Sequence, residues 1–445
     1  MALNPRKPIL NKEGKILSSS KKQIKWSKVD SFIGNRSSDA LTYHRPCPIC
    51  GSLHSKTVLE LSDFQFYSDS ATSPKRVTVR ENMCQDCFAL YLNPCYSSYG
   101  FRVLFEEAGQ SYGSTEGRPQ EQIDWLEDRG RLKNGFSFLD VGCYDGSFLS
   151  RLPDGLRKMG VDIDGPAIER GRQRHGEQGL KFFLGDFETF EFDGPPPDTI
   201  TMFHVLEHLA RPVKVLEKLK KIAKKNTALV VEVPVLDQAR TNDIHGFFST
   251  MHVTHFSKES LGNCLKMAGW HVAESKMHAD YNGYLVLAYP GDSIGSGAAC
   301  GNASDLLSMH NYFRDWYDGL ATVEAKSKFV HDSKHCLIWG GGLHTEFLYH
   351  TTSFFSGSKG VRFAIVDKDE KKHGKTWRGV EISDPCVLPE VDWSTTVLVP
   401  SSYGGHYAII DEALSMGVPS KNIVQLYSYL KGRKVVGRID LSSAK

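Results

Sequence analysis

The stretch that most constrains the fold is FLDVGCYDGSFL, residues 138–149. Apolar residues flank Asp140, a turn containing Gly142 and Gly146 follows, and apolar residues return at Phe148. This is the pattern of a buried strand, a tight glycine turn and the start of a helix. Glycine allows a positive φ and lets a ligand approach bare backbone N–H groups. Asp140 would lie at the carboxyl end of the strand, where open α/β sheets bind ligands, although an ordinary strand–helix turn matches this stretch as well.

Three further segments follow it in order. In KMGVDIDGPAIERGR, Val161 and Ile163 indicate a second strand that ends near Asp162 or Asp164, where an acidic residue can bind both ribose hydroxyls of a nucleotide. The segment LKFFLGDFETF predicts a third strand that ends at Asp186. The run TITMFHVLEHLARP predicts a fourth strand that leads into a short helix.

This order of a glycine loop, an acidic ribose residue, a Gly-Asp pair and a strand that runs into a histidine-containing helix resembles the class I S-adenosylmethionine (SAM)-dependent methyltransferases. All four signals fall within residues 138–211. The resemblance implies an α/β, Rossmann-like domain with SAM as cofactor. It places the following residues at the cofactor: Asp140, Gly142, Tyr144, Asp145, Gly146, Asp162, Asp186, Phe187 and Phe203.

Two CxxC pairs precede this domain. Cys47 and Cys50 stand in CPICG, and Cys84 and Cys87 stand in NMCQDC. Two such knuckles are typical of a zinc ribbon, in which four thiolates surround one tetrahedral Zn²⁺ ion. Four cysteines leave no open coordination position, so the predicted zinc is structural, and the neighbouring histidines are expected to face solvent. The alternative is four buried or free thiols.

Composition sets limits on partners and compartment. The chain has 445 residues and a net charge of +2, which gives no general electrostatic case for nucleic acid. No apolar run reaches the roughly 18 residues of a membrane span, and the first residues lack the apolar core of a secretory signal. Scattered cysteines and two CxxC pairs suit a reducing compartment, so we expect a cytoplasmic protein without a membrane partner.

The chain divides into six predicted segments. Residues 1–40 are basic and poor in large apolar side chains, which is typical of a disordered tail. A zinc-binding module (41–110) and a linker helix (111–135) lead to the SAM-dependent methyltransferase domain (136–290). In this domain, Ser257 is predicted to cap a late helix. A linker with a helix (291–325) connects to a second Rossmann-like domain (326–445).

The last domain begins with CLIWGGGLHTEFL, a short apolar strand followed by three glycines and a helix. Further strands are predicted at RFAIVDKD, TVLVPSS and NIVQLY, with the helix AIIDEALSMG before the last one. The glycines 340–342 either receive a diphosphate at a helix N-terminus or form only a tight turn. The sequence leaves both possibilities open.

The combination of a four-cysteine module, a SAM domain and a C-terminal Rossmann-like domain resembles the sugar-nucleotide C-methyltransferase family. Residues 140–146 match the family's glycine loop at Gly142, Asp145 and Gly146, with Asp140 in place of Glu and Tyr144 in place of Asn. In STMHVTHFS, His252 matches the catalytic histidine, and Phe256 and Ser257 also match. Met251, Ser249 and His255 stand where the family has Glu and two Tyr residues.

The resemblance implies methyl transfer to a nucleotide-linked deoxysugar, at carbon or oxygen. Histidine is the usual base near neutral pH, so His208 and His252 are the predicted proton acceptors, and Glu207 orients His208 or caps the short helix. His204 is expected to touch adenine or a neighbouring residue. Predicted substrate contacts are Tyr112, His255, Gly340, Gly342 and His344. The alternatives are another acceptor, such as a glycan, a small metabolite or RNA, and a non-catalytic SAM-binding scaffold.

Overall fold

The protein was analysed as a computed structural model, which describes residues 24–29, 41–66, 75–101, 118–238, 251–278, 282–293, 301–402 and 405–427. Tyr112, Ser249 and most of the predicted tail and glycine-rich linker lie outside these ranges. One part of the predicted tail differs from a free chain. Ser27 exchanges two backbone hydrogen bonds with Phe363 of the C-terminal domain (2.9 and 2.7 Å), and Trp26 packs against His335.

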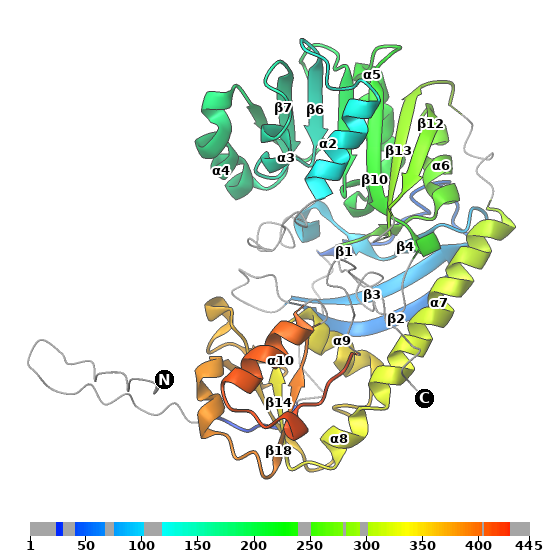
Figure 1. The fold of residues 1–445 in the computed structure, drawn as a ribbon. Coiled ribbons are helices and arrows are strands. Elements are labelled where there is room, and N and C mark those ends of the chain that lie inside the picture. The colour runs from blue at the N-terminus through cyan, green and yellow to red at the C-terminus, as the bar shows by residue number, and fades with distance from the viewer. Residues whose placement is uncertain are drawn as a thin grey trace, which may run out of the picture.

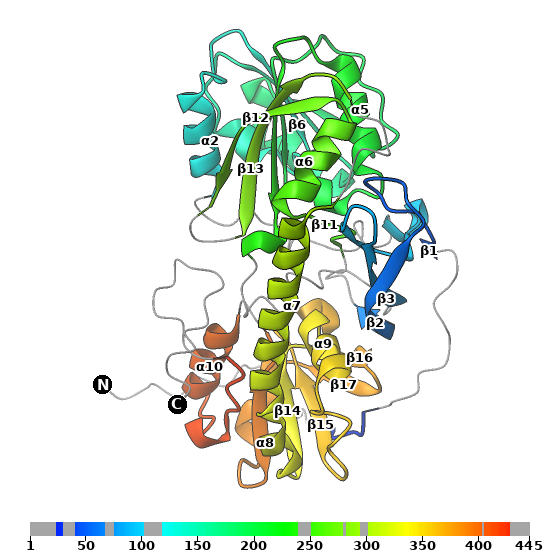
Figure 2. The same cartoon turned by 90° about the vertical axis from the view of Figure 1, so that its right-hand side faces the viewer.

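The central domain contains a seven-stranded sheet with the order β12-β13-β10-β9-β6-β7-β8 (Figures 1 and 2). All neighbouring pairs are parallel except the two that involve β13. The strands are β6 (Ser137–Val141), β7 (Arg157–Asp162), β8 (Lys181–Leu184), β9 (Thr199–Phe203), β10 (Ala228–Pro234), β12 (Trp270–Met277) and β13 (Gly283–Pro290). The four predicted strands and the predicted α/β class are confirmed.

Helices cover both faces of this sheet. The helices α5 (Pro212–Ile222) and α6 (Lys258–Met267) pack on one face, and α2 (Arg118–Asp128), α3 (Ser147–Ser150) and α4 (Gly165–His175) pack on the other. Ser257 caps α6 as predicted, because its hydroxyl accepts a hydrogen bond from the backbone N–H of Ser260. A short 3₁₀ helix, η3 (Leu206–His208), follows β9.

The cysteine-containing module is built on a long hairpin that was not predicted. Strands β2 (Ser55–Phe66) and β3 (Lys75–Cys84) pair with each other, and β4 (Leu90–Leu92) and β11 (Thr254–His255) extend the sheet. A second small sheet pairs β1 (Thr42–Tyr43) with β5 (Cys95–Tyr96). Buried Arg45 joins the module to the central domain by donating to the carbonyl oxygens of Leu92, Ala210 and Val253.

The C-terminal domain has a five-stranded sheet with the order β16-β17-β15-β14-β18. Its strands are β14 (His335–Trp339), β15 (Arg362–Val366), β16 (Thr376–Trp377), β17 (Val380–Ser383) and β18 (Thr396–Pro400), and its longer helices are α9 (Leu343–Thr351) and α10 (His406–Ser415). The predicted strand at NIVQLY is wrong: a 3₁₀ turn (Ser420–Asn422) and one isolated bridge from Ile423 stand there. The Asn422 side chain donates to two carbonyl oxygens beside β18, which holds the segment as a turn.

Helix α7 (Ala303–Glu324) runs along the side of the molecule from the central domain to the C-terminal domain (Figures 1 and 2). Asn302 and Asp305 form a capping box at its start. The buried side chains recur every three or four residues, as one helical face requires: Met309, Tyr312, Trp316, Leu320 and Val323. They belong to a core that also contains hairpin and C-terminal residues. Helix α8 (Ser327–His331) follows.

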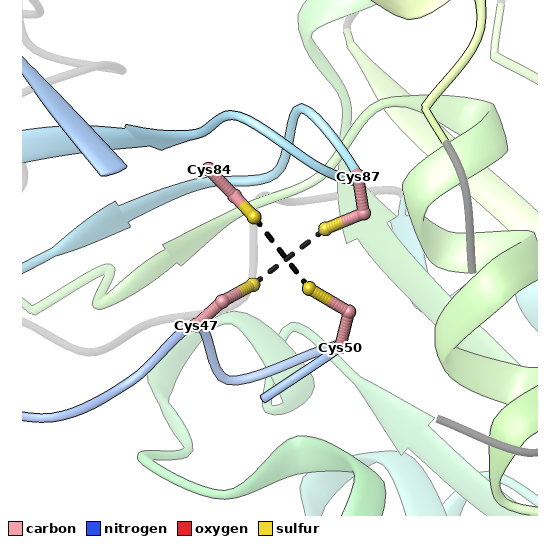
Figure 3. A group of neighbouring side chains, drawn as sticks. All are labelled: Cys47, Cys50, Cys84 and Cys87. Carbon is pink, nitrogen blue, oxygen red and sulfur yellow. Dashed lines mark hydrogen bonds between the residues drawn. The ribbon is translucent and has the colours of Figure 1, made fainter. Parts of the chain in front are cut away.

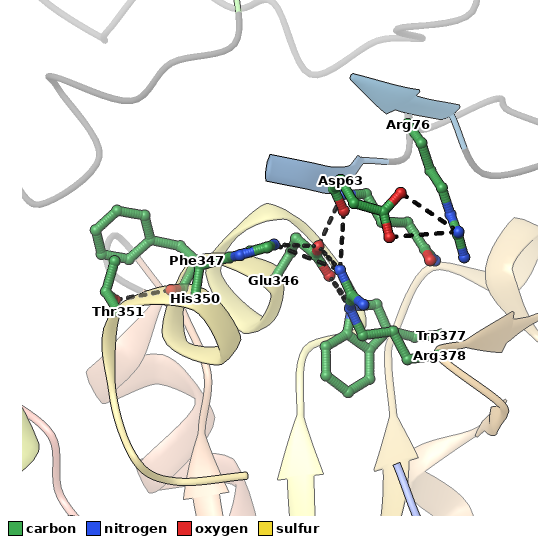
Figure 4. A network of polar contacts seen from close by, with 9 residues as sticks. Asp63, Arg76, Glu346, Phe347, His350, Thr351, Trp377 and Arg378 are labelled. Atoms are coloured by element: carbon green, nitrogen blue, oxygen red, sulfur yellow. Dashed lines mark hydrogen bonds and ion pairs between the residues drawn. The ribbon is translucent and has the colours of Figure 1, made fainter. Parts of the chain in front are cut away.

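A buried polar network attaches the hairpin to the C-terminal domain (Figure 4). The Glu346 carboxylate accepts hydrogen bonds from the Arg378 guanidinium and from the Trp377 indole (2.9 Å). It also accepts from the backbone N–H of Gln65 on β2 (2.7 Å), while Arg378 donates to the carbonyl oxygen of Asp63 (3.0 Å). A buried ion pair is stable only when its charged groups are fully hydrogen-bonded. The network therefore requires both the Glu346 carboxylate and the Arg378 guanidinium.

Candidate active site

The glycine loop after β6 needs glycine at two positions. Gly142 and Gly146 have φ values of 81° and 75°. A Cβ atom on Gly142 would lie 2.1 Å from Val205 Cγ2, and one on Gly146 would lie 2.5 Å from the Phe182 ring. Both sites therefore exclude a side chain, through backbone conformation and through space.

Two aspartates stand at the ends of neighbouring strands, and Asp162 holds this loop. The Asp162 carboxylate accepts hydrogen bonds from the backbone N–H groups of Tyr144 (2.7 Å) and Asp164 (2.9 Å). Asp140 accepts from the Thr201 hydroxyl (2.6 Å). Burial outweighs this hydrogen bond and raises the pKa of Asp140 to about 7.

A cavity of about 1100 Å³ lies at the carboxyl ends of β6, β7 and β9. Of the nine residues predicted to contact the cofactor, all except Gly146 line it: Asp140, Gly142, Tyr144, Asp145, Asp162, Asp186, Phe187 and Phe203. The cavity therefore collects side chains from four separate segments of the sequence at one edge of the sheet, where this type of fold binds ligands.

Other lining residues were missed in the sequence. Tyr43, Tyr96 and Phe101 reach the cavity from the cysteine-containing module. Nothing in the sequence signals this approach, because it depends on how the module docks on the central domain. Arg170 and Arg174 line the cavity from α4, and Arg170 hydrogen-bonds the Tyr144 hydroxyl (3.0 Å). Their spacing of four residues, just after the second strand, could have identified one basic helix face.

The polar cluster beside this cavity contains three of the predicted proton-transfer residues. His204 and His208 line the cavity, whereas Glu207 lies beneath them with 1% of its side chain exposed. The Glu207 Oε1 atom is 3.4 Å from His204 Nδ1, 3.9 Å from His208 Nε2 and 4.0 Å from His252 Nε2. The rings of His208 and His252 lie 4.8 Å apart. The structure thus brings Glu207, His208 and His252 together.

The charges of this cluster follow from burial and from neighbouring ions. Burial opposes ionisation of Glu207, but the neighbouring histidines outweigh it and lower its pKa to about 2. Burial likewise opposes the charged form of His204, but Glu207 and Glu232 raise its pKa to about 9. For His252, burial and the nearby His208 hold the pKa well below its usual range. The cluster therefore contains an imidazolium, a carboxylate and a neutral imidazole at neutral pH.

Several predicted residues lie away from the large cavity. His252 and His255 line a separate cavity of about 20 Å³, and His255 hydrogen-bonds the buried Glu81 of the hairpin (3.1 Å). Gly340, Gly342 and His344 lie in the C-terminal domain and do not line the large cavity. His344 is buried and hydrogen-bonds the Tyr427 hydroxyl (2.9 Å). The four predicted substrate contacts among these residues and the predicted catalytic His252 therefore do not line the large cavity.

The four cysteines of the two knuckles converge at the end of the hairpin (Figure 3). Cys47 Sγ lies 3.6 Å from Cys87 Sγ, and Cys50 Sγ lies 3.5 Å from Cys84 Sγ. All four sulfur atoms are within 4.8 Å of one another. The flanking His44 and His54 are exposed, as expected. A tetrahedral thiolate site requires this mutual proximity, so the residues present fit a zinc ion.

Residues 115–275 match a protein family described as a methyltransferase domain. An uncharacterized 37.1 kDa protein in transposon TN4556 of Streptomyces fradiae is 28% identical over 146 residues, which are 32% of this chain and 39% of that protein. The chain thus matches less than half the length of this relative.

Two solved structures are similar to part of the chain. Magnesium protoporphyrin IX methyltransferase from Synechocystis, with bound S-adenosylhomocysteine, is 18% identical with a TM-score of 0.36, over 44% of this chain and 100% of that one. A SAM-dependent methyltransferase from Aquifex aeolicus is 18% identical with a TM-score of 0.32, over 40% of this chain and 98% of that one. The sheet order, the glycine loop and the family match together identify the central region as a methyltransferase domain with the class I, SAM-dependent fold.

Proposed function

We propose that the protein transfers a methyl group from SAM to a nucleotide-linked sugar. One observation carries the proposal: two different parts of the chain line the large cavity. The glycine loop and Asp162 of the central domain line it, as a nucleoside cofactor needs, and so do Tyr43, Tyr96 and Phe101 of the module. The volume of about 1100 Å³ exceeds the usual range for one drug-sized ligand, which leaves room for an acceptor beside the cofactor.

The resemblance to sugar-nucleotide C-methyltransferases supports this acceptor class. Tyrosine rings can stack on a sugar or a base, and Ser97 and Ser98 add hydroxyl groups to the cavity wall. Arg211 lines the same region and is paired with Glu188 (2.8 Å). An acceptor with hydroxyl groups and a diphosphate would find partners among these side chains.

In the proposed reaction, bound SAM supplies an electrophilic methyl group, and the protein aligns the acceptor atom behind it. His208 is the proposed base. Its Nδ1 atom lies 2.8 Å from the Met251 carbonyl oxygen, which can only accept a hydrogen bond, so Nδ1 carries the hydrogen. Nε2 is then the ring nitrogen that is proposed to take the acceptor's proton. His252 and Glu207 are proposed to position His208 from behind.

The cysteine cluster is proposed to hold one structural Zn²⁺ ion. Zinc would fix the two knuckles at the end of the hairpin whose far end docks on the C-terminal domain. Thiolates of this kind persist in a reducing cytoplasm, the proposed location. Metal analysis of the purified protein should give zinc bound to the wild type, and C47S with C84S should lose it. Retention of zinc by this double variant would contradict the assignment.

The test of the proposed function is thermal stability with S-adenosylhomocysteine, alone and with a panel of nucleoside diphosphates. Ligand at ~100 times its dissociation constant adds about 2.7 kcal/mol to the free energy of unfolding. Stabilisation by the cofactor product together with one nucleotide supports a sugar-nucleotide acceptor and identifies its base. Stabilisation by the cofactor product alone would reject this acceptor class. If neither ligand stabilises the protein, the proposal that the cavity binds SAM is rejected.

A second test concerns the base. H208Q keeps a side chain of similar reach but cannot accept the proton, so kcat should fall at least about 100-fold while the affinity for S-adenosylhomocysteine stays unchanged. H271A, at an exposed position of β12, is the matched control and should retain full activity. Undiminished turnover by H208Q would remove His208 from the proposed mechanism.

A further inference from the structure

Glu207 is an unusual carboxylate among the described residues. Its side chain is 1% exposed, and neither oxygen accepts a hydrogen bond from a residue in the described part of the chain. Three imidazole rings surround it at 3.4–4.0 Å, beyond normal hydrogen-bond length. A buried carboxylate without hydrogen bonds is costly, and the His204 ring at 3.4 Å supplies a neighbouring charge but no hydrogen bond.

The hydrogen bond of His208 fixes which ring nitrogen faces Glu207. Since the Nδ1–H of His208 donates to the Met251 carbonyl oxygen (2.8 Å), Nε2 is the ring nitrogen that lies towards Glu207, 3.9 Å from Oε1. An imidazole whose other nitrogen donates to a carbonyl is also the usual arrangement of a metal-binding histidine.

The spacing of the donor atoms suits a small cation. One oxygen of Glu207 and one nitrogen each of His208 and His252 lie within 4.8 Å of one another. Zinc–ligand bonds of about 2.0–2.2 Å place neighbouring ligands roughly 3–4 Å apart, so small side-chain movements would close the shell. The backbone already holds the two segments together, because the Val253 N–H donates to the Glu207 carbonyl oxygen (2.9 Å).

We propose that Glu207, His208 and His252 bind one divalent transition-metal ion at the wall of the methyl-transfer cavity. Two imidazoles and a carboxylate are donors that Zn²⁺, Fe²⁺, Co²⁺ and Mn²⁺ accept. This set is distinct from the four thiolates of the knuckles. Three protein ligands leave a coordination position open, as in catalytic metal sites. Because His208 lines the cavity, that position can face the acceptor.

The consequence of the site rests on the proposed function. A hydroxyl oxygen of the acceptor would bind the ion, which lowers the pKa of that hydroxyl. The O–H bond breaks and its proton passes to water. The oxygen then forms a bond to the methyl carbon as the carbon–sulfur bond breaks, and the sulfur keeps the electron pair. With the ion bound, the metal activates the acceptor in place of the His208 imidazole, which is the proposed base when no ion is bound.

The experiment counts metal ions per chain. Protein stripped by a chelator is titrated with Co²⁺ and followed by absorption and by elemental analysis. Wild type should bind two equivalents: one with the intense sulfur-to-metal charge-transfer bands of a thiolate site, and one with only weak bands of nitrogen and oxygen ligands. E207Q and H252A should each lose the second equivalent, and H271A should keep both.

The results of this experiment distinguish the proposed second metal site from the proposed methyl-transfer function. A single equivalent in wild type, with thiolate bands only, overturns the second metal site. Two equivalents in E207Q and H252A, with both retaining native affinity for S-adenosylhomocysteine, also overturn it. Since metal is counted without turnover, loss of the second equivalent supports the site even if no nucleotide stabilises the protein. Failure to bind S-adenosylhomocysteine in wild type counts against the methyl-transfer function instead.

Discussion

The two Rossmann-like domains share one hydrogen-bonding arrangement and differ in what surrounds it. In the central domain, Asp162 accepts from Tyr144 N (2.7 Å) and from Asp164 N (2.9 Å). In the C-terminal domain, Asp367 accepts from Gly341 N (2.8 Å) and from Asp369 N (2.9 Å). An acidic residue after the second strand therefore fixes the glycine turn after the first strand in both domains.

The surroundings of the two loops decide their use. The first loop borders the cavity of about 1100 Å³. In the second, the Lys372 ammonium lies 3.1 Å from the Asp367 carboxylate, so the protein's own cation neutralises this group. The hydrogen bond between His344 and Tyr427 follows directly beside the turn. A glycine turn held by an aspartate is thus a property of the fold, and the space next to it marks the ligand site.

Removal of the Glu346 side chain should give the largest difference between the two domains, with a loss of stability in the C-terminal domain alone. E346A leaves Arg378, whose side chain is 1% exposed, as an unpaired buried charge, and such losses cost about 3–5 kcal/mol. We expect hydrogen-exchange protection to fall in β14 and β15 while the affinity for S-adenosylhomocysteine is unchanged. E412A, at a partly exposed ion pair with Lys368, is the control with nearly no effect. A parallel loss of cofactor binding would show that the C-terminal domain contributes to the cavity.

A pair of glycine variants compares the two turns directly. In G142A the new Cβ would clash with Val205, and in G340A it would lie 2.5 Å from the Ser401 carbonyl oxygen, with φ at 122°. Each strain is worth about 1–3 kcal/mol. Isothermal titration should show at least tenfold weaker S-adenosylhomocysteine binding for G142A and native binding for G340A. Equal losses in both variants would contradict the distinction between the loops.

The two aspartates provide a milder comparison. D162N removes the charge that we expect to bind the ribose hydroxyls, and a hydrogen bond to a charged group is worth about 1.5–3 kcal/mol. Affinity for S-adenosylhomocysteine should fall about 10- to 100-fold. D367N should leave it unchanged, because its loop contacts no described part of the large cavity. A similar fall in D367N would mean that loop rigidity, and not ligand contact, determines affinity.

The smallest expected effect is a pH dependence of stability, which has opposite signs for one buried group in each domain. The pKa of Asp140 is about 7 in the folded state and about 3.9 when unfolded, so its folded form keeps a proton that the unfolded chain loses between these values. The contribution of Asp140 to stability should therefore fall as pH rises through this window, by about 1.4 kcal/mol from pH 5 to pH 6, and it is measured as the difference between wild type and D140N because the buried His252 contributes a slope of opposite sign. Protection of β6 and β9 in D140N should lack this slope.

His406 supplies the comparison in the C-terminal domain. Burial lowers its pKa to about 4, so the unfolded chain binds a proton first as pH falls below about 6.5. Stability of this domain should fall with decreasing pH between these values, and H406Q should remove the slope. If D140N and H406Q changed the slopes in the same direction, the assignment of these two groups would be contradicted.

Much of the central domain could be predicted because its signals are local. Alternating strands and glycine turns, and the cap at Ser257, depend on neighbouring residues. The gathering of eight predicted residues at one cavity was predictable for the same reason, since parallel strands place their carboxyl ends at one edge of a sheet. The predicted strand at residues 422–427 failed because an apolar run cannot distinguish a strand from a packed turn.

The remainder depends on contacts between distant segments. The hairpin β2–β3 was missed although it organises the module, and the approach of Tyr43, Tyr96 and Phe101 to the cavity follows from docking of two domains. His252 was predicted as a proton acceptor, and it lies 4.0 Å from the Glu207 carboxylate beside a smaller cavity. Such positions require the tertiary fold, because residues 204–208 and 251–255 are distant in the sequence and come together only in the folded chain, where the Val253 N–H donates to the Glu207 carbonyl oxygen.

Helix α7 has a consequence for how the chain can change in length. Its 22 residues reach about 33 Å at a rise of ~1.5 Å per residue, and it contacts both domains along one continuous face. Adding one residue in its middle would move the far domain by only about 1.5 Å but rotate it by roughly 100°. Insertions of seven residues, close to two full turns, would nearly restore the orientation. Each inserted residue therefore changes both the distance and the relative rotation of the two domains. Only insertions close to a whole number of helical turns would keep their orientation.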